Sequence, residues 1–544
     1  MKKLLTKISL SNLILSIIFS IALFYMSKIN FLGYVFNENY IDNIFLNEFS
    51  ILFFLIPIAY ILLHFIEKNY IKLSSIIISN QEIENKTFFC CRVFIFLLII
   101  YLIYYFTFYP GGVYIDSWTA FNMLTGENEF TSQQPVLYTL MLYIVKLFLP
   151  DLYTGFGIFT LLQVIAMISV FTYFIYWLLT KKVNSIFVTL IALFLGFFNL
   201  YPLYSVSIWK DTPFSLAIFL YTLTLIDLII DSKNQNIQIR NIVKFNLFAL
   251  LVLFLRNNGI YICLGTIFIL LFLFFIDIIK KTKIKHIVSF TITSISTILF
   301  FLIIESLYPY FGIDTSSTLV ESIGIPLQQV ARVVAVDGNL TNNQKELIEK
   351  ILPIENIKKN YRAMLVDPIK WDSNFNNEYL ENHLQDYFKL WFEIFLQNPN
   401  EYIKSYLLQT SGFWALHVKG PEAFHSAVIW ETLNNILQNQ DLIAQRSHFS
   451  FRDDLLKIPY YSGGFFFWIT ILSMFITFKN CNKKYLIGYI PSLLLWLTVM
   501  ISTPMASALR YVYALVLILP LNIVYPAIFK NKNNEIKLLD SKSK

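Results

Sequence analysis

Long apolar runs, separated by short polar segments, follow one another along most of the chain. A helix needs about 20 predominantly apolar residues to cross a bilayer, and most of the runs approach that length. They lie at residues 8–27, 50–66, 88–107, 156–179, 184–202, 213–230, 243–256, 258–276, 287–305, 463–478, 485–501 and 511–528. The pattern predicts an all-α polytopic membrane protein with about twelve transmembrane helices.

Positive charge is distributed unevenly between these runs, and the asymmetry indicates the orientation. The short loops on one side carry few basic residues: Lys28, Lys146, Lys210, Arg256 and Arg510. By the positive-inside rule, the other side is the cytoplasm, so both termini are expected to be cytoplasmic in a multi-pass protein of the cell membrane. The shorter apolar run at 135–149 is predicted to be an interfacial helix, because a crossing there would place the basic cluster at 280–285 outside.

Composition agrees with a membrane protein and excludes a soluble one. Hydrophobic residues make up 56% of the 544 residues and charged residues only 14%, which is too apolar for a water-soluble protein. The net charge of +7 is accounted for by cytoplasmic segments, so nucleic acid is not expected as a partner. The expected surroundings of most of the chain are the lipid bilayer.

The runs divide the chain into consecutive regions. These are two N-terminal transmembrane helices (1–87), a transmembrane core (88–305) with an outer loop (108–155), an extracytoplasmic helical loop (306–461), a C-terminal three-helix membrane segment (462–530) and a cytoplasmic tail (531–544). In the large loop, Thr341 and Gln344 predict a capping box. Apolar residues at helical spacing predict an amphipathic helix over 379–395. Asn398-Pro399 is expected to break it and to start a further helix toward Trp414.

Unusual polar residues stand at the outer ends of the expected spans, not within them. Asp116 follows a Pro-Gly-Gly turn in the first outer loop, and Lys210, Arg256 and Arg510 stand in three later outer segments. We expect these residues to converge on one face. Asp116 is the candidate general base, and the three cations are candidates for binding the phosphate of a lipid-linked donor.

Simpler interpretations of the same residues stay open. Asp116 can cap the short helix expected at 118–124. The three cations can be anchors that extend to the membrane interface, with Lys210 paired to its neighbour Asp211.

Other polar and aromatic residues near these segments are candidates for substrate contacts. They are Trp118, Gln133, Gln134, Asp211, Asn257, Asn258, Gln328, Gln329, Arg332, His417 and Tyr511. No spacing of His, Cys or carboxylate residues predicts a metal site. No cofactor is therefore expected, although the sequence leaves a divalent metal open.

These motifs resemble those of the GT-C superfamily of membrane glycosyltransferases, which includes protein mannosyltransferases and the aminoarabinose transferase of lipid A. The chain is similar in particular to an uncharacterised bacterial branch of that superfamily. The shared motifs stand here at Pro110–Asp116, Trp209–Asp211, Arg256–Gly259, Gly324–Gln329 and Arg510–Tyr513.

The resemblance implies a polyprenyl-phosphate sugar donor and a role for Asp116 as base or as the residue that orients the acceptor. The sequence departs from many relatives at Gln134-Pro135, where they have His-Pro. It also has two additional spans before the outer loop at 108–155, which corresponds to the first outer loop of those relatives. It also lacks an Asp-x-Asp motif, so the resemblance gives no support for a catalytic metal here.

The leading hypothesis is an inverting glycosyltransferase that transfers a sugar to a cell-envelope glycan, lipid or protein. A glycan polymerase or ligase of the O-antigen type is the alternative, and it would place its essential Arg332 and His417 in the large loop. A lipid-linked glycan flippase is the non-enzymatic alternative, and it would need polar residues along a path through the middle of the membrane.

Overall fold

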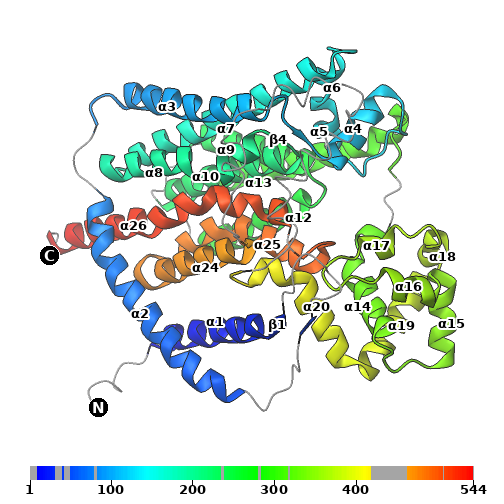
Figure 1. Cartoon of the computed structure of the whole chain (residues 1–544). Coiled ribbons are helices and arrows are strands. Elements are labelled where there is room, and N and C mark those ends of the chain that lie inside the picture. Colours follow the sequence, from blue (N-terminus) through cyan, green and yellow to red (C-terminus); the bar gives the residue numbers. More distant parts are fainter. Residues whose placement is uncertain are drawn as a thin grey trace.

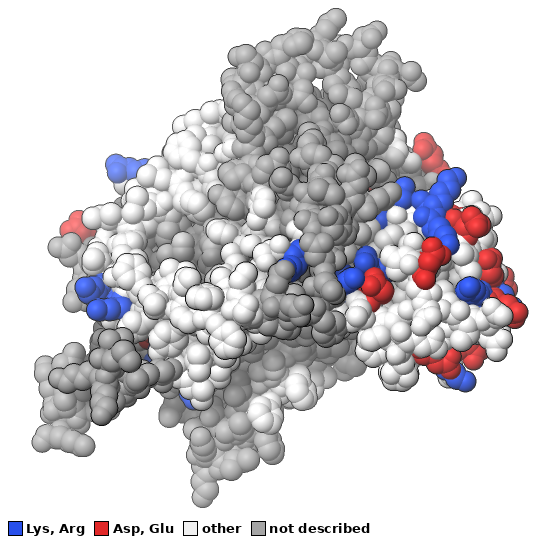
Figure 2. Space-filling view, turned by 60° about the horizontal axis from the view of Figure 1, so that its bottom comes forward, with Lys and Arg blue, Asp and Glu red and all other residues white. Residues whose placement is uncertain are grey.

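The computed structural model describes residues 9–30, 40–41, 49–78, 83–233, 238–279, 284–315, 319–417, 462–506 and 508–542. They form a body of long apolar helices and a smaller helical lobe at one end of it (Figure 1). The lobe, residues 319–414, carries most of the charged side chains visible in Figure 2. Residues 418–461 of the predicted large loop lie outside the described residues.

Twelve helices of the body coincide with the twelve predicted apolar runs. They are α1 (Leu10–Lys28), α2 (Leu52–Ile77), α3 (Lys86–Thr107), α7 (Leu152–Thr180), α8 (Ser185–Phe197), α10 (Asp211–Lys233), α11 (Ile239–Leu255), α12 (Gly259–Ile279), α13 (Ile284–Leu307), α24 (Gly463–Asn480), α25 (Ile490–Ser502) and α26 (Tyr513–Lys542). Within the described residues, nine helices are long and apolar enough to cross a membrane. α8, α11 and the part of α12 whose side chains are described are shorter than such a span. The fold is therefore an all-α, multi-pass membrane protein, and the number of twelve crossings stays a prediction.

The helices of the body form a buried centre and an exposed periphery. In the most apolar stretch of each helix, 83% of the residues are buried in α10 and 94% in α26. The corresponding shares are only 22% in α1 and 17% in α2. Apolar side chains on the outer helices face outward, as lipid-facing residues do. α26 continues to Lys542, so most of the predicted tail is part of this helix.

Two prolines inside α26 are accommodated by side chains from neighbouring helices. Pro520 and Pro526 lack an N–H, so each leaves a carbonyl one turn earlier without its helical donor. The Tyr201 hydroxyl donates to the carbonyl freed by Pro520 at 2.9 Å, and the Ser473 hydroxyl donates to the one freed by Pro526 at 2.6 Å. Such substitute donors are necessary where no water reaches the backbone.

The N-terminal helix α2 is attached to α26 beside the second proline. The Tyr70 hydroxyl donates to the Ile523 carbonyl at 2.6 Å and accepts from the Ala527 amide at 3.2 Å. Glu67 of α2 also pairs with Lys479 of α24 at 2.8 Å. These contacts fix α2 to the body.

Short elements lie at the same end of the body as the lobe. They are β3 (Gly112–Val113), α4 (Ile115–Thr125), α5 (Val136–Met141), α6 (Tyr143–Lys146), α9 (Leu200–Ser205), β4 (Ser207–Ile208) and η7 (Leu509–Val512). Another short helix, η6 (Lys483–Tyr489), directly precedes α25. The predicted interfacial helix at 135–149 is thus two short helices, α5 and α6. At the outer edge, β1 (Ile29–Asn30) pairs antiparallel with β2 (Tyr40–Ile41), followed by η2 (Phe49–Ile51).

The lobe has an apolar core of its own. Its elements are η4 (Leu319–Glu321), α14 (Gly324–Ala335), α15 (Asn342–Ile351), α16 (Ile354–Asn360), α17 (Asp367–Lys370), α18 (Asn377–Asn382), α19 (Leu384–Gln397) and α20 (Pro399–Trp414), preceded by η3 (Tyr308–Phe311). The capping box of Thr341 and Gln344 forms as predicted. The predicted helix at 379–395 is broken at His383, and Phe388 of its apolar face is exposed.

A short backbone pairing joins the lobe to the body. The Val366 amide donates to the Pro504 carbonyl at 3.0 Å, and the Ala506 amide donates to the Met364 carbonyl at 2.9 Å. Leu365 and Met505 form an antiparallel bridge between them. Because this pairing lies just before η7, the lobe is attached beside Arg510.

Candidate functional site

A parallel pair of short strands forms the base of the site. β3 pairs with β4, with Gly112 opposite Ser207, and so brings the first outer loop against the segment that precedes α10. Gly111 has a φ of +115°, and a Cβ there would lie 2.2 Å from the Thr160 hydroxyl oxygen. This position therefore requires glycine.

α4 begins directly after β3 and carries Asp116 in its first turn. The Ser117 hydroxyl is fully buried, donates to the Ile208 carbonyl at 2.6 Å and bonds the Tyr138 hydroxyl at 2.7 Å. The residue next to Asp116 is thus fixed to β4 and α5. The helix starts earlier than the predicted 118–124, and its N-cap residue Tyr114 makes no side-chain cap.

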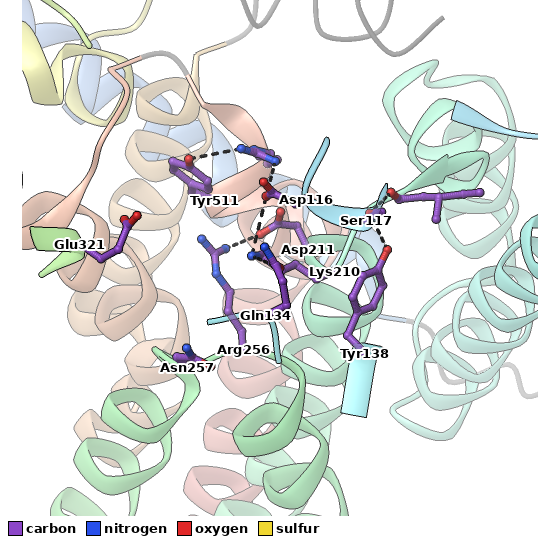
Figure 3. Close-up of polar contacts among 12 residues, drawn as sticks. Asp116, Ser117, Gln134, Tyr138, Lys210, Asp211, Arg256, Asn257, Glu321 and Tyr511 are labelled. Atoms are coloured by element: carbon purple, nitrogen blue, oxygen red, sulfur yellow. Dashed lines mark hydrogen bonds and ion pairs between the residues drawn. The ribbon is translucent and has the colours of Figure 1, made fainter. Parts of the chain in front are cut away.

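The Asp116 carboxylate contacts two of the three predicted cations. Its Oδ2 lies 3.2 Å from Arg510 Nη1 and 3.7 Å from Lys210 Nζ. Lys210 also donates to Gln134 Oε1 at 2.8 Å. The Asp116 side chain is 31% exposed, so the carboxylate is partly exposed although cations hold it. Figure 3 shows it close to Lys210 and Asp211.

Arg256 has a different anionic partner. Its guanidinium forms an ion pair with Asp211, whose side chain is 1% exposed. Asp211 belongs to the first turn of α10, and Arg256 follows the end of α11. The pair therefore joins two neighbouring helices. Lys210 contacts Asp116 and Gln134, and the predicted pairing of Lys210 with its neighbour Asp211 does not form.

Aromatic rings surround the Arg510 guanidinium. Its central carbon lies 4.4 Å from the ring centre of Tyr114, 5.6 Å from that of Trp209 and 5.0 Å from that of Tyr511. The Tyr511 ring also lies 5.0 Å from Arg256. Rings at these distances stabilise a cation, so Arg510 is held in position independently of Asp116.

The surroundings of Asp116 shift its acidity. Burial alone would raise the pKa of the Asp116 carboxyl, but the charges of Lys210, Arg510 and Arg256 outweigh that effect and lower the pKa below its ordinary value. Asp116 is therefore ionised at neutral pH.

Among the other predicted residues of the body, Gln134 bonds directly to the ionic site, and the rest have other surroundings. Gln134 holds Lys210, whereas Gln133 is exposed. The Asn257 amide donates to the Ser132 carbonyl and the Asn258 amide to the Thr498 hydroxyl, each at 3.3 Å. The remaining one, Trp118, packs its ring against Phe121 and Phe156.

The predicted residues of α14 lie inside the lobe and bond to other lobe residues. Gln328 donates to the Arg362 carbonyl, and Gln329 accepts from the Trp391 indole at 2.8 Å. Arg332 is mostly buried and pairs with Glu401 at 2.9 Å. These contacts indicate structural roles for all three. His417 is an exposed residue that follows α20.

Several residues of the site were missed in the sequence. Ser117, Tyr138 and Tyr114 lie around Asp116 and Arg510, and their contacts depend on how the segments pack in the fold. Figure 3 also shows Glu321 of the lobe, which lies on the side of Tyr511 and Arg256. It pairs at 2.8 Å with the buried Lys370. No spacing signal links these residues.

The site thus contains three cations and two carboxylates from four segments distant in sequence. Two buried polar atoms, Asp211 Oδ2 and Arg510 Nε, have no hydrogen-bond partner. Within the described residues, no group of three His, Cys, Asp or Glu side chains is placed to hold a metal ion. Guanidinium and ammonium groups in such a setting suit a phosphate or carboxylate ligand.

Fold and site together define a multi-pass, all-helical membrane protein with a compact ionic site at one end of its body. The chain belongs to a family of unknown function, DUF6020, which matches residues 103–537. No curated protein and no solved structure matches the chain. The matched range includes the whole ionic site and begins after α1 and α2.

Proposed function

We propose that this protein is a membrane glycosyltransferase of the GT-C type, acting at the extracytoplasmic face of the cell membrane. Its donor is a sugar linked to polyprenyl phosphate, and its acceptor is a hydroxyl of a cell-envelope glycan, lipid or protein. The observation that carries the proposal is the partly exposed Asp116 carboxylate between Lys210 and Arg510.

The chemistry follows from the charges. Asp116 accepts the proton of the acceptor hydroxyl, the hydroxyl oxygen forms a bond to the anomeric carbon, and the bond from that carbon to the phosphate oxygen breaks. The electron pair leaves with the polyprenyl phosphate, whose negative charge Lys210 and Arg510 stabilise. Attack opposite the leaving group inverts the anomeric centre.

The contacts within the lobe make the polymerase or ligase alternative weaker. That alternative requires Arg332 and His417 to act on the substrate, whereas Arg332 is committed to Glu401 and to the Tyr361 hydroxyl at 3.3 Å. The concentration of charge at one end of the body, away from the middle of the spans, supports an enzyme over a flippase.

A transfer assay separates these functions. Native membrane vesicles that contain the protein receive undecaprenyl phosphate carrying a radiolabelled hexose, and label in the acceptor fraction is counted. Lys210→Met should lower transfer by about 10² to 10³, and His417→Ala at equal protein level should keep most of it. Loss with His417→Ala and retention with Lys210→Met would support the polymerase or ligase instead.

A further inference from the structure

Asp116 occupies the cations that a donor phosphate would need. One of its oxygens, Oδ2, faces both Lys210 Nζ at 3.7 Å and Arg510 Nη1 at 3.2 Å. A carboxylate and a phosphate oxygen bind the same fork of a guanidinium and the same ammonium hydrogens. The two anions therefore compete for the same donors.

The three cations differ in how freely they can change partner. Arg256 is tied to the buried Asp211, and breaking that pair would leave a buried charge alone. Arg510 is held by three rings, so it keeps its place without a carboxylate. Lys210 already shares its ammonium between Gln134 and Asp116, and its long flexible chain lets it turn.

We propose that Asp116 is the resident anion of the phosphate site, and that the donor phosphate displaces it from Lys210 and Arg510. The carboxylate then becomes a proton acceptor only in the donor complex. Arg256 is a positioning residue that holds α10 and α11 through Asp211, and it is not a phosphate ligand. This inference rests on the proposed function and adds an order of events to it.

Charge balance supports the exchange. Three cations and two carboxylates leave the free site with one net positive charge, and Asp116 and Asp211 both lie within electrostatic reach of Arg510. A sugar phosphodiester carries one negative charge and neutralises the site. Once the cations turn to the phosphate, Asp116 loses the interactions that make it a weak base.

The advantage of this arrangement is control of the acceptor reaction. Before the donor binds, Asp116 is paired and attracts a hydroxyl proton weakly. After the donor binds, the same carboxylate is released beside the anomeric carbon. A water molecule or an acceptor alone does not release it.

Binding of undecaprenyl phosphate to the full chain, purified in detergent, tests the inference without any acceptor. If Asp116 competes with the phosphate, Asp116→Asn should bind this lipid about tenfold more tightly than the unchanged protein, although it removes a residue of the site. Glu129→Gln removes an exposed carboxylate of the same outer loop and is the matched control. It should leave the affinity within about twofold.

The coupling between Asp116 and Lys210 gives a second readout. In the unchanged protein, Lys210 gives up its contact with Asp116 to bind the phosphate. Lys210→Met should therefore weaken binding by a larger factor in the Asp116→Asn background than in the unchanged protein. Asp116→Ser, a second variant without the carboxylate, should reproduce the gain if Asp116→Asn does not fold to a monodisperse protein.

The outcomes separate the two proposals. Equal or weaker binding by both carboxylate-free variants, with undecaprenyl phosphate still bound by the unchanged protein, would overturn the inference alone. An unchanged protein that does not bind undecaprenyl phosphate would overturn the proposed function as well. A gain with Glu129→Gln equal to that with Asp116→Asn would reduce the effect to net charge and overturn the inference.

Discussion

Two carboxylates of the ionic site, Asp116 and Asp211, share its cations but have different surroundings. The Asp211 side chain is 1% exposed and pairs with Arg256. The Asp116 side chain is 31% exposed and lies between Lys210 and Arg510. A buried, paired carboxylate acts as a structural link. The partly exposed Asp116 is more accessible to a substrate, and the proposed function therefore uses Asp116 for chemistry and Asp211 as a structural link.

The pH dependence of transfer should follow the ionisation of Asp116. Burial would raise the pKa of its carboxyl group, but the charges of Lys210, Arg510 and Arg256 lower it below the ordinary value. Activity needs the carboxylate, which is present above that pKa and lost as the pH falls through it. The acid limb of kcat/KM should thus lie below the ordinary range of a carboxyl group, and Lys210→Met should move the limb to higher pH. An acid limb that does not move would contradict this assignment.

Gln134 and Gln133 offer a test of how Lys210 is positioned. Gln134 accepts the Lys210 hydrogen bond at 2.8 Å, while its neighbour Gln133 is exposed. Losing one hydrogen bond to a charged group corresponds to about 1.5 to 3 kcal/mol, so Gln134→Ala should lower kcat/KM for the donor roughly tenfold or more. Gln133→Ala is the control. Equal effects of the two variants would speak against a positioning role for Gln134.

Sequence patterns predict the residues of the site better than their partners. Asp116, Lys210, Arg256 and Arg510 follow from charge at the outer ends of apolar runs, and the structure brings them together. The pairing of Arg256 with Asp211 depends on how α10 packs on α11, which no local spacing encodes. Tyr511 was a predicted site residue, whereas the contact of the Tyr114 ring with Arg510 was missed for the same reason.

At the scale of elements, apolar periodicity predicts the helices of the body because each long run must satisfy its backbone internally. The sequence does not predict that helix 379–395 breaks at His383, or that α14 directs Gln328 and Arg332 into the lobe. Both depend on the lobe's core. A polar residue on an amphipathic helix can face substrate or a neighbouring helix with the same local pattern.

The attachment of α2 to α26 is expected to contribute measurably to stability. Tyr70 replaces a helical hydrogen bond beside Pro526 through its contacts with Ile523 and Ala527. Tyr70→Phe should lower the free energy of unfolding by about 0.5 to 2 kcal/mol, because polar contacts between membrane helices have that size. Thermal unfolding in detergent measures it, and Tyr310→Phe, at a residue that is 85% exposed, should change nothing. Equal transitions for the two variants would show that Tyr70 makes no such contribution.

At the scale of the whole molecule, the lobe is attached to the body close in sequence to Arg510 of the ionic site. The segment at 364–366 pairs with 504–506 just before Arg510, so the position of the lobe and that of the guanidinium are linked. The sequence predicts a helical loop of this size but not its contact with the body, since that contact joins segments far apart in the chain.

A cross-link tests this attachment. Leu365 and Met505 are opposite each other in an antiparallel bridge, which brings Cβ atoms within the range of a disulfide. With the four native cysteines replaced by serine, Leu365→Cys with Met505→Cys should form an intramolecular disulfide under mild oxidation. It should also keep at least half of the transfer activity. Absence of the cross-link, measured by mass spectrometry of the digested protein, would contradict the observed attachment.

The turnover of Asp116→Asn is the most direct test of the central claim that this carboxylate and its cations form one catalytic site. Sugar transfer from undecaprenyl phosphate hexose is measured in vesicles containing equal amounts of folded protein. Because the amide cannot accept the hydroxyl proton, the rate should fall by about 10² to 10⁴. A rate within a few-fold of that of the unchanged protein would contradict the account.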